Sequence, residues 1–161
     1  MIILGLNAFH ADSSACILRD GTLVAAAEEE RFRRVKHWAG FPAQAIAYCL
    51  AEAKLRVGDI DHVAVNQDDG AAKWQRLGYA LAHPPDPRLV IDRLRTRHER
   101  RAVPELLGAV FRGERFRGEF HAVEHHLAHL SSAFHVSPFD EAAIVSVDGF
   151  GDFSSAAWGT G

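Results

Sequence analysis

The chain has 161 residues, of which 48% are hydrophobic and 24% are charged, which is enough to bury one ordinary core. Its 18 basic and 21 acidic residues give a net charge of −3, which argues against the positive surface that nucleic-acid binding requires. The apolar start has no basic leader and is far too short to span a membrane. Because Cys16 and Cys49 both sit in apolar runs, we expect a reducing, cytoplasmic setting.

Three short strands open the chain. Residues 2–6 and 14–19 are rich in branched apolar side chains, and residues 22–27 follow the turn signal Asp20-Gly21. The polar loop at residues 7–13 joins the first two strands, in a position where ligand-binding groups are common. The sequence therefore predicts a three-stranded antiparallel start.

Residues 28–66 combine a charged run with helix and strand patterns. The charged run at residues 28–37 predicts a solvated face. After Pro42, a helix ending near Ala53 is predicted from the spacing of Ala43, Ile46, Ala47 and Leu50. Alternating side chains then predict a strand at residues 61–66.

Helices and strands alternate in the rest of the chain. Helical spacings within residues 71–117 predict two or three helices, with Pro104 opening the last. The remaining pattern predicts a strand at 119–123, a helix at 124–135, a buried strand at 142–148 and a further strand at 153–158. This order favours an α/β fold of the ribonuclease-H type.

Two histidines carry the sharpest chemical signal. On the predicted helix, His125 and His129 lie about 40° apart around the axis, so two imidazoles can hold one metal ion. His126 lies about 100° from His125 and is interpreted as a supporting residue. The alternative is a pair that only faces solvent. A core stripe on the opposite side of the helix is predicted from Leu127, Leu130, Ser131 and Phe134.

Two further polar segments are candidate sites. The glycine amides of Gly149 and Gly151 can approach a phosphate, while Asp148 and Asp152 can hold a cation or its waters. An ordinary hairpin turn is the alternative. In the first loop, His10 or Asp12 can accept a proton from a hydroxyl, and Lys36 offers a positive charge for a phosphate or carbonyl. A polar turn and a solvated lysine are the alternatives there.

Several independent motifs together resemble the NodU/CmcH family of carbamoyltransferases, namely residues 4–15, 28–32, 35–42, 124–129 and 146–152. The resemblance implies an actin-like, ribonuclease-H-like mixed sheet flanked by helices. Residues 1–161 would then be the first half of a duplicated domain, without its second half and without the domain that forms carbamoyl-adenylate. On this basis the fragment alone is expected to be inactive.

The resemblance also implies a function, which is ATP-dependent O-carbamoyl transfer. Carbamoyl phosphate and ATP would give carbamoyl-adenylate, and the carbamoyl group would pass to a hydroxyl of a small molecule or natural product, as in antibiotic biosynthesis. His125 and His129 would hold Fe²⁺ or another divalent metal, with an aspartate beyond residue 161 as third protein ligand; Mg²⁺ is a further candidate. The alternatives are transfer to tRNA or protein, a sugar kinase, and a non-catalytic fragment that binds metal or nucleotide.

Overall fold

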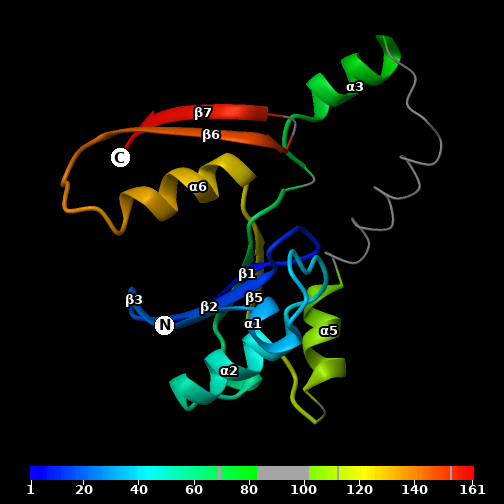
Figure 1. The fold of residues 1–161 in the computed structure, drawn as a ribbon, viewed down its shortest axis with the longest axis vertical. Coiled ribbons are helices and arrows are strands. Elements are labelled where there is room, and N and C mark those ends of the chain that lie inside the picture. The colour runs from blue at the N-terminus through cyan, green and yellow to red at the C-terminus, as the bar shows by residue number, and fades with distance from the viewer. Residues whose placement is uncertain (69, 83–101, 112, 153) are drawn as a thin grey trace. The chain divides into compact units, whose positions relative to one another are not determined.

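The computed structural model describes residues 1–68, 70–82, 102–111, 113–152 and 154–161 (Figure 1). The described residues fall into two compact units, the first within residues 1–65 and 102–121 and the second within residues 66–82 and 122–161. A five-stranded sheet organises the first unit and a two-stranded sheet the second. Within the described residues, no helix combines the length and the apolar character needed to cross a membrane.

The five-stranded sheet is mixed. Strands β1 (Ile2–Asn7), β2 (Ser14–Arg19) and β3 (Thr22–Glu28) pair in antiparallel fashion, as predicted. The turn between β2 and β3 has positive φ at Asp20 (51°) and Gly21 (82°), which suits a tight hairpin. Strand β4 (His62–Val65) pairs in parallel with β1, and β5 (Glu119–Ala122) lies beside β4 at the edge of the sheet. The strand order is therefore β3-β2-β1-β4-β5.

Two helices cover one face of this sheet and close the core of the first unit (Figure 1). Helix α2 (Ala43–Ala53) packs against β2 and β3, and α5 (Val103–Val110) begins with a proline in its first turn, as predicted. Each fully buried large apolar side chain stabilises the fold by about 1.5–3 kcal/mol. Fully buried examples from the sheet and both helices are Leu4, Ile17, Ile46, Val63, Val103 and Leu107. The predicted mixed α/β architecture is thus confirmed.

The charged run contains a short helix and one buried carboxylate. Helix α1 (Glu30–Arg33) is solvent-accessible, but Glu29 is 0% exposed, so the predicted solvated face is wrong at this position. One Glu29 oxygen accepts from the backbone N–H groups of Gln44 (2.9 Å) and Ala45 (2.8 Å), and the other accepts from Arg33 Nε (2.7 Å). Glu29 therefore caps the N-terminus of α2, where a negative charge is favoured.

Both cysteines carry free thiols, and Cys49 is fully buried in the first unit. Burial raises the pKa of the Cys49 thiol to about 11. Because only the thiolate is nucleophilic, we expect iodoacetamide at pH 8 to alkylate Cys49 about 10²-fold more slowly in the folded chain than in urea. Peptide mass spectrometry measures the rate at Cys49 separately from that at Cys16. Equal rates in the folded and unfolded chain would contradict this prediction.

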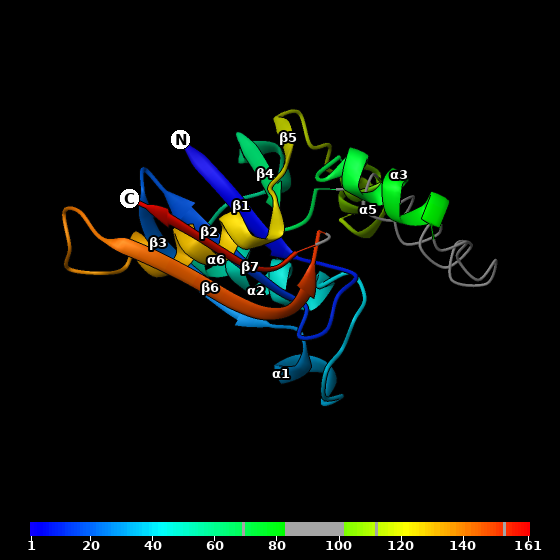
Figure 2. The same cartoon turned by 90° about the horizontal axis from the view of Figure 1, so that it is seen from above.

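In the second unit, one helix lies along a two-stranded hairpin (Figure 2). Helix α6 (His125–Phe134) packs on β6 (Ala143–Gly151) and β7 (Ser154–Thr160), and α3 (Lys73–Ala82) belongs to the same unit. Leu130 and Phe134 lie toward β7, but Leu127 is 53% exposed. The predicted core stripe of α6 is therefore wrong at Leu127.

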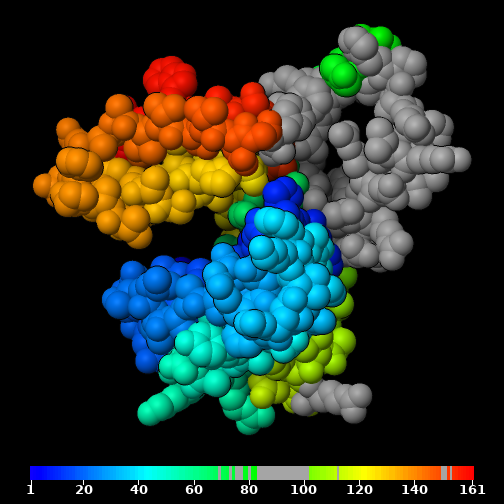
Figure 3. Space-filling model, in the orientation of Figure 1, coloured from blue at the N-terminus to red at the C-terminus, as the bar shows by residue number. Residues whose placement is uncertain are grey.

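Strand β6 is not the buried strand that its apolar sequence predicts. Ser146 is buried on the side of α6, whereas Val145 and Val147 are 70% and 81% exposed on the other side. Successive side chains of a strand point to opposite faces, so the two valines share one open face. In Figure 3, side chains of β6 (orange) lie at the visible surface. Phe153 and residues 83–101, for which strand and helix were predicted, lie outside the described residues.

Candidate metal centre

Two carboxylates fix the start of α6. Glu124 accepts from the backbone N–H groups of His126 (3.1 Å) and Leu127 (2.6 Å), and Asp152 Oδ2 accepts from the N–H of His125 (2.9 Å). The first three helical amides, which have no partner within the helix, are thereby satisfied. His125 is consequently held in the first turn, and His129 lies one turn further along.

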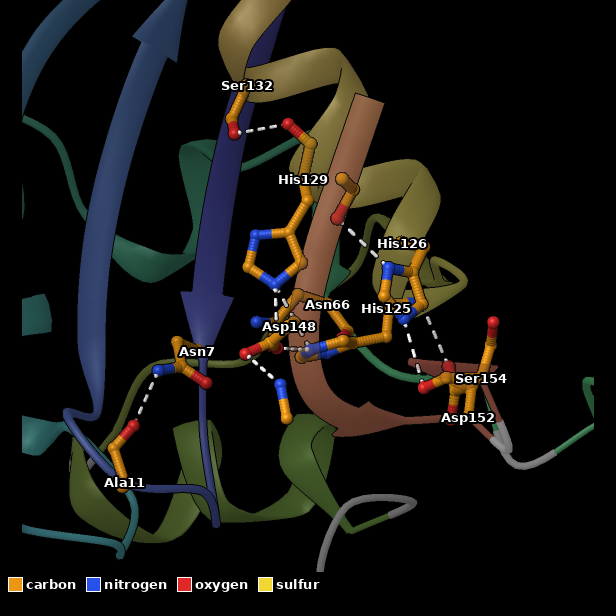
Figure 4. A network of polar contacts seen from close by, with 12 residues as sticks. Asn7, Ala11, Asn66, His125, His126, His129, Ser132, Asp148, Asp152 and Ser154 are labelled. Atoms are coloured by element: carbon orange, nitrogen blue, oxygen red, sulfur yellow. Dashed lines mark hydrogen bonds and ion pairs between the residues drawn. The ribbon is translucent and has the colours of Figure 1, made fainter. Parts of the chain in front are cut away.

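The two histidines converge with an aspartate of β6, and we call His125, His129 and Asp148 the α6 centre (Figure 4). The two Nε2 atoms are 3.1 Å apart, and Asp148 Oδ2 lies 2.9 Å from that of His125 and 3.2 Å from that of His129. His125 is only 5% exposed, so the alternative of a pair that only faces solvent is wrong for this residue. His129 and Asp148 remain open to solvent.

The contacts of His125 and Asp148 suit a bound cation. His125 Nδ1 lies 3.3 Å from the carbonyl oxygen of Asn66, and Nε2 is directed at Asp148. When Nδ1 donates to this carbonyl, the lone pair of Nε2 is available to a cation that Asp148 also contacts. The His125 imidazole, the backbone N–H of Gly149 and the His129 imidazole hold the pKa of Asp148 well below its usual range. The carboxylate is therefore ionised at neutral pH and available as a ligand.

The spacing of the three donor atoms fits a divalent metal. Ligand distances of about 2.1 Å at right angles place neighbouring donors roughly 3.0 Å apart, whereas a tetrahedral site places them about 3.4 Å apart. The observed separations of 2.9, 3.1 and 3.2 Å are closer to the right-angled arrangement. Two imidazoles and one carboxylate on one side of the ion also form a common set for non-haem Fe²⁺.

His126 anchors α6 to the two strands of the hairpin. It is 1% exposed, with Nδ1 2.9 Å from Ser146 Oγ and Nε2 3.1 Å from the carbonyl oxygen of Ser154. The carbonyl accepts the Nε2 proton, so Nδ1 accepts from the hydroxyl when the ring is neutral. His126 thus joins α6 to both strands of the hairpin, and both of its ring nitrogens are engaged.

Substitution of His126 by alanine should destabilise the fold by about 2–3 kcal/mol, because it opens a cavity and leaves the buried Ser146 hydroxyl and the partly buried Ser154 carbonyl without their partner. Thermal unfolding measures this loss. His135→Ala is the matched control, since His135 is an exposed histidine at the end of the same helix, and it should stay within about 0.5 kcal/mol. Equal stability of the two variants would show that His126 does not anchor α6.

Gly149, Gly151 and Asp152, which the sequence predicts to bind a phosphate or a cation, lie outside the α6 centre. Gly149 has open space where a side chain would begin, so its backbone can be approached closely. Gly151 pairs with Ser154 across the hairpin, so β6 continues through most of the predicted turn. Asp152 has a φ of 47°, is buried, and accepts from the N–H of Asp68 (2.8 Å) as well as from α6. Its observed contacts organise the backbone, and nucleotide binding by these residues stays a prediction.

In the first unit, two loops are tied together. The backbone N–H of Phe9 donates to the carbonyl of Gly40 (3.3 Å), and that of Ser13 donates to the carbonyl of Trp38 (2.9 Å). The Ser13 hydroxyl also donates to the Gly40 carbonyl (2.8 Å). The first loop and the end of the charged run therefore form one structural element, which the sequence did not reveal.

The three predicted catalytic residues lie on these joined loops. Asp12 Oδ1 is 2.9 Å from Nδ1 of His37, so the carboxylate already has an imidazole partner. His10 and Lys36 have exposed side chains. The structure places all three in the first unit and the α6 centre in the second, and a catalytic role for His10, Asp12 or Lys36 stays a prediction.

Sequence relatives agree with the motifs. Two matches are 34% identical: the uncharacterised protein sll1178 of Synechocystis, over 99% of this chain and 27% of that protein, and the nodulation protein NolNO of Sinorhizobium fredii, over 96% and 22%. The uncharacterised protein MJ1051 of Methanocaldococcus jannaschii is 30% identical over 94% of this chain and 23% of that protein. The chain thus spans about a quarter of the length of these relatives.

Among solved structures, YeaZ from Pseudomonas aeruginosa aligns with 92% of this chain and 55% of its own, at 18% identity and a TM-score of 0.46, a likeness too weak to carry an assignment. The sequence profile of the family described as "Carbamoyltransferase N-terminus" matches residues 2–159. That match covers nearly the whole chain and confirms the predicted family resemblance. The chain belongs to the carbamoyltransferase N-terminus family.

Proposed function

We propose that this chain is the metal-binding part of an ATP-dependent O-carbamoyltransferase. Carbamoyl phosphate would be hydrolysed to carbamate and phosphate, and the carbamate would displace pyrophosphate from ATP to give carbamoyl-adenylate. The carbamoyl group would then pass to a hydroxyl of a small-molecule or natural-product acceptor. The observation that carries the proposal is the convergence of His125, His129 and Asp148 within 3.2 Å of one another, in a chain of the carbamoyltransferase family.

The α6 centre would hold Fe²⁺, which its donor set and spacing suit best, although Zn²⁺ and Mn²⁺ take similar ligands. A bound divalent ion supplies positive charge that polarises a carbonyl or phosphoryl oxygen and neutralises a developing negative charge. The protein's part is to keep the three ligands in place. His125 is oriented by the Asn66 carbonyl and by the capped start of α6, so its ring needs little reorganisation on binding.

Other residues would bind the nucleotide. The backbone at Gly149, which is open to close approach, and at Gly151 would receive the phosphate of the adenylate, while Asp148 and Asp152 would hold the Mg²⁺ that accompanies ATP, or its waters. Lys36 would neutralise phosphate charge as a flexible cation.

In the transfer step, the acceptor oxygen attacks the carbamoyl carbon, the bond from that carbon to the phosphate oxygen breaks, and AMP leaves. The hydroxyl proton must be removed at the same time, a task worth about 10²–10⁴-fold in rate. Asp12 would accept it, with His37 stabilising the carboxylate at 2.9 Å, and His10 is the other candidate base.

The test uses the complete protein to which this chain belongs. Incubation with ATP, carbamoyl phosphate and a panel of hydroxylated acceptors should release AMP only when all three are present, together with a carbamoylated acceptor detected by mass spectrometry. Release of ADP with a phosphorylated acceptor would instead indicate a kinase, and carbamoylation of tRNA or protein would replace the small-molecule acceptor. The isolated 161-residue chain should bind metal but show no turnover.

A further inference from the structure

A second group of metal-ligating side chains lies in the first unit, on strands β4 and β5, and we call His62, Glu119 and His121 the β4–β5 cluster. Val63 packs into the core, so its neighbour His62 points to the opposite face of the sheet. Phe120 packs toward the same core, which places Glu119 and His121 on that opposite face as well. Because β4 and β5 are hydrogen-bonded neighbours, side by side in Figure 2, the three side chains meet.

The donor atoms of the β4–β5 cluster converge. His62 Nδ1 lies 3.0 Å from His121 Nε2, and Glu119 Oε2 lies 3.9 Å from the first and 3.8 Å from the second. The side chains of His62, His121 and Glu119 are 30%, 45% and 75% exposed, so an ion from solvent can reach them. These separations bracket the roughly 3.4 Å between donors of a tetrahedral site.

The backbone holds the cluster in register. A side chain at Gly118 would collide with the Asp61 carbonyl, so the approach of β5 to the start of β4 requires glycine. The N–H of Glu119 donates to that same carbonyl (2.9 Å). The Asp61 carboxylate accepts from the N–H of Ile2 (2.7 Å), so it is committed to β1. The two strands are thereby pinned directly beside the cluster.

We propose that the β4–β5 cluster is a Zn²⁺ site that clamps β5 to β4. Two imidazole nitrogens that face each other at 3.0 Å need a proton or a cation between them, and the nearby Glu119 carboxylate supplies the negative charge that favours a cation. Two histidines, one glutamate and one water complete a tetrahedral set. The site shares no residue with the α6 centre.

The number of Zn²⁺ ions bound per chain tests the proposal. In a titration of the full chain against a chromophoric chelator, the double variant His62→Asn with His121→Asn should bind one ion fewer than the unchanged chain. Glu119→Gln should lower the affinity for that Zn²⁺ ion by at least about tenfold, as expected when a charged ligand becomes neutral. His135→Asn, at an exposed histidine outside both groups, should bind as many ions as the unchanged chain.

A measurement without substitutions guards against a variant that does not fold. Zn²⁺ should protect His62 and His121, but not His135, from diethyl pyrocarbonate, as followed by mass spectrometry of the modified peptides. The proposal is overturned if the double variant is folded and binds as many ions as the unchanged chain. It is equally overturned if Zn²⁺ leaves His62 and His121 as reactive as His135, since the pair is then only a hydrogen-bonded surface contact.

Discussion

On the proposed function, replacing His125 and His129 together by asparagine should abolish metal binding at the α6 centre and lower the rate of carbamoyl transfer by at least about 10³-fold, because the site would lose the ion expected to stabilise developing charge. The convergence of both Nε2 atoms on Asp148 makes this the largest functional effect expected from two substitutions in the chain. The measurements are the metal content of the complete protein by mass spectrometry and its rate of AMP release with acceptor.

Two further variants make this experiment specific. His135→Asn should leave both metal content and rate unchanged, since His135 is exposed and belongs to neither group of ligands. Asp148→Asn keeps both imidazoles but removes the negative charge, so it should weaken metal binding while leaving the helix intact. Full metal occupancy in the folded double variant would show that the α6 centre does not hold the ion.

Replacement of Glu29 by alanine should cost about 3 kcal/mol of the free energy of unfolding, the largest stability effect expected here. The substitution leaves the N–H groups of Gln44 and Ala45 without their acceptor and Arg33 without its ion-pair partner. Glu29→Gln keeps an acceptor oxygen and should lose less. Urea unfolding followed by circular dichroism gives the free energy for each variant.

The neighbouring Glu28 provides a matched control. Its side chain is 45% exposed and pairs with the exposed Arg31 at 3.2 Å, so Glu28→Ala should change the stability by no more than about 0.5 kcal/mol. Similar losses in Glu28→Ala and Glu29→Ala would mean that the buried cap of α2 contributes little.

The regular elements could be predicted from the sequence because their periodicity is local. The first three strands, the helix after Pro42 and the helix that carries His125 all follow from alternation, helical spacing and turn residues. The burial of Glu29 could not be predicted in this way. Its partners lie 15 and 16 residues later, and only the folded chain brings the start of α2 to it.

The α6 centre was predicted in part. Helical spacing brings His125 and His129 together without any tertiary information. The sequence assigns Asp148 to a separate phosphate-binding segment, where it can hold a cation or its waters, because its distance along the chain from the histidines says nothing about how β6 packs on α6. The register of that packing, in which Ser146 contacts His126 and Asp148 contacts the other two rings, depends on tertiary contacts.

The arrangement of β6 has a practical consequence for handling the purified chain. Its polar, chemically active side chains face the helix, while Val145 and Val147 face outward beside Trp158 on β7, which is 82% exposed. An exposed apolar surface of this kind promotes self-association in water and binds fluorescent hydrophobic dyes. We therefore expect the purified chain to aggregate less at low concentration and in mild detergent, which covers the exposed apolar surface.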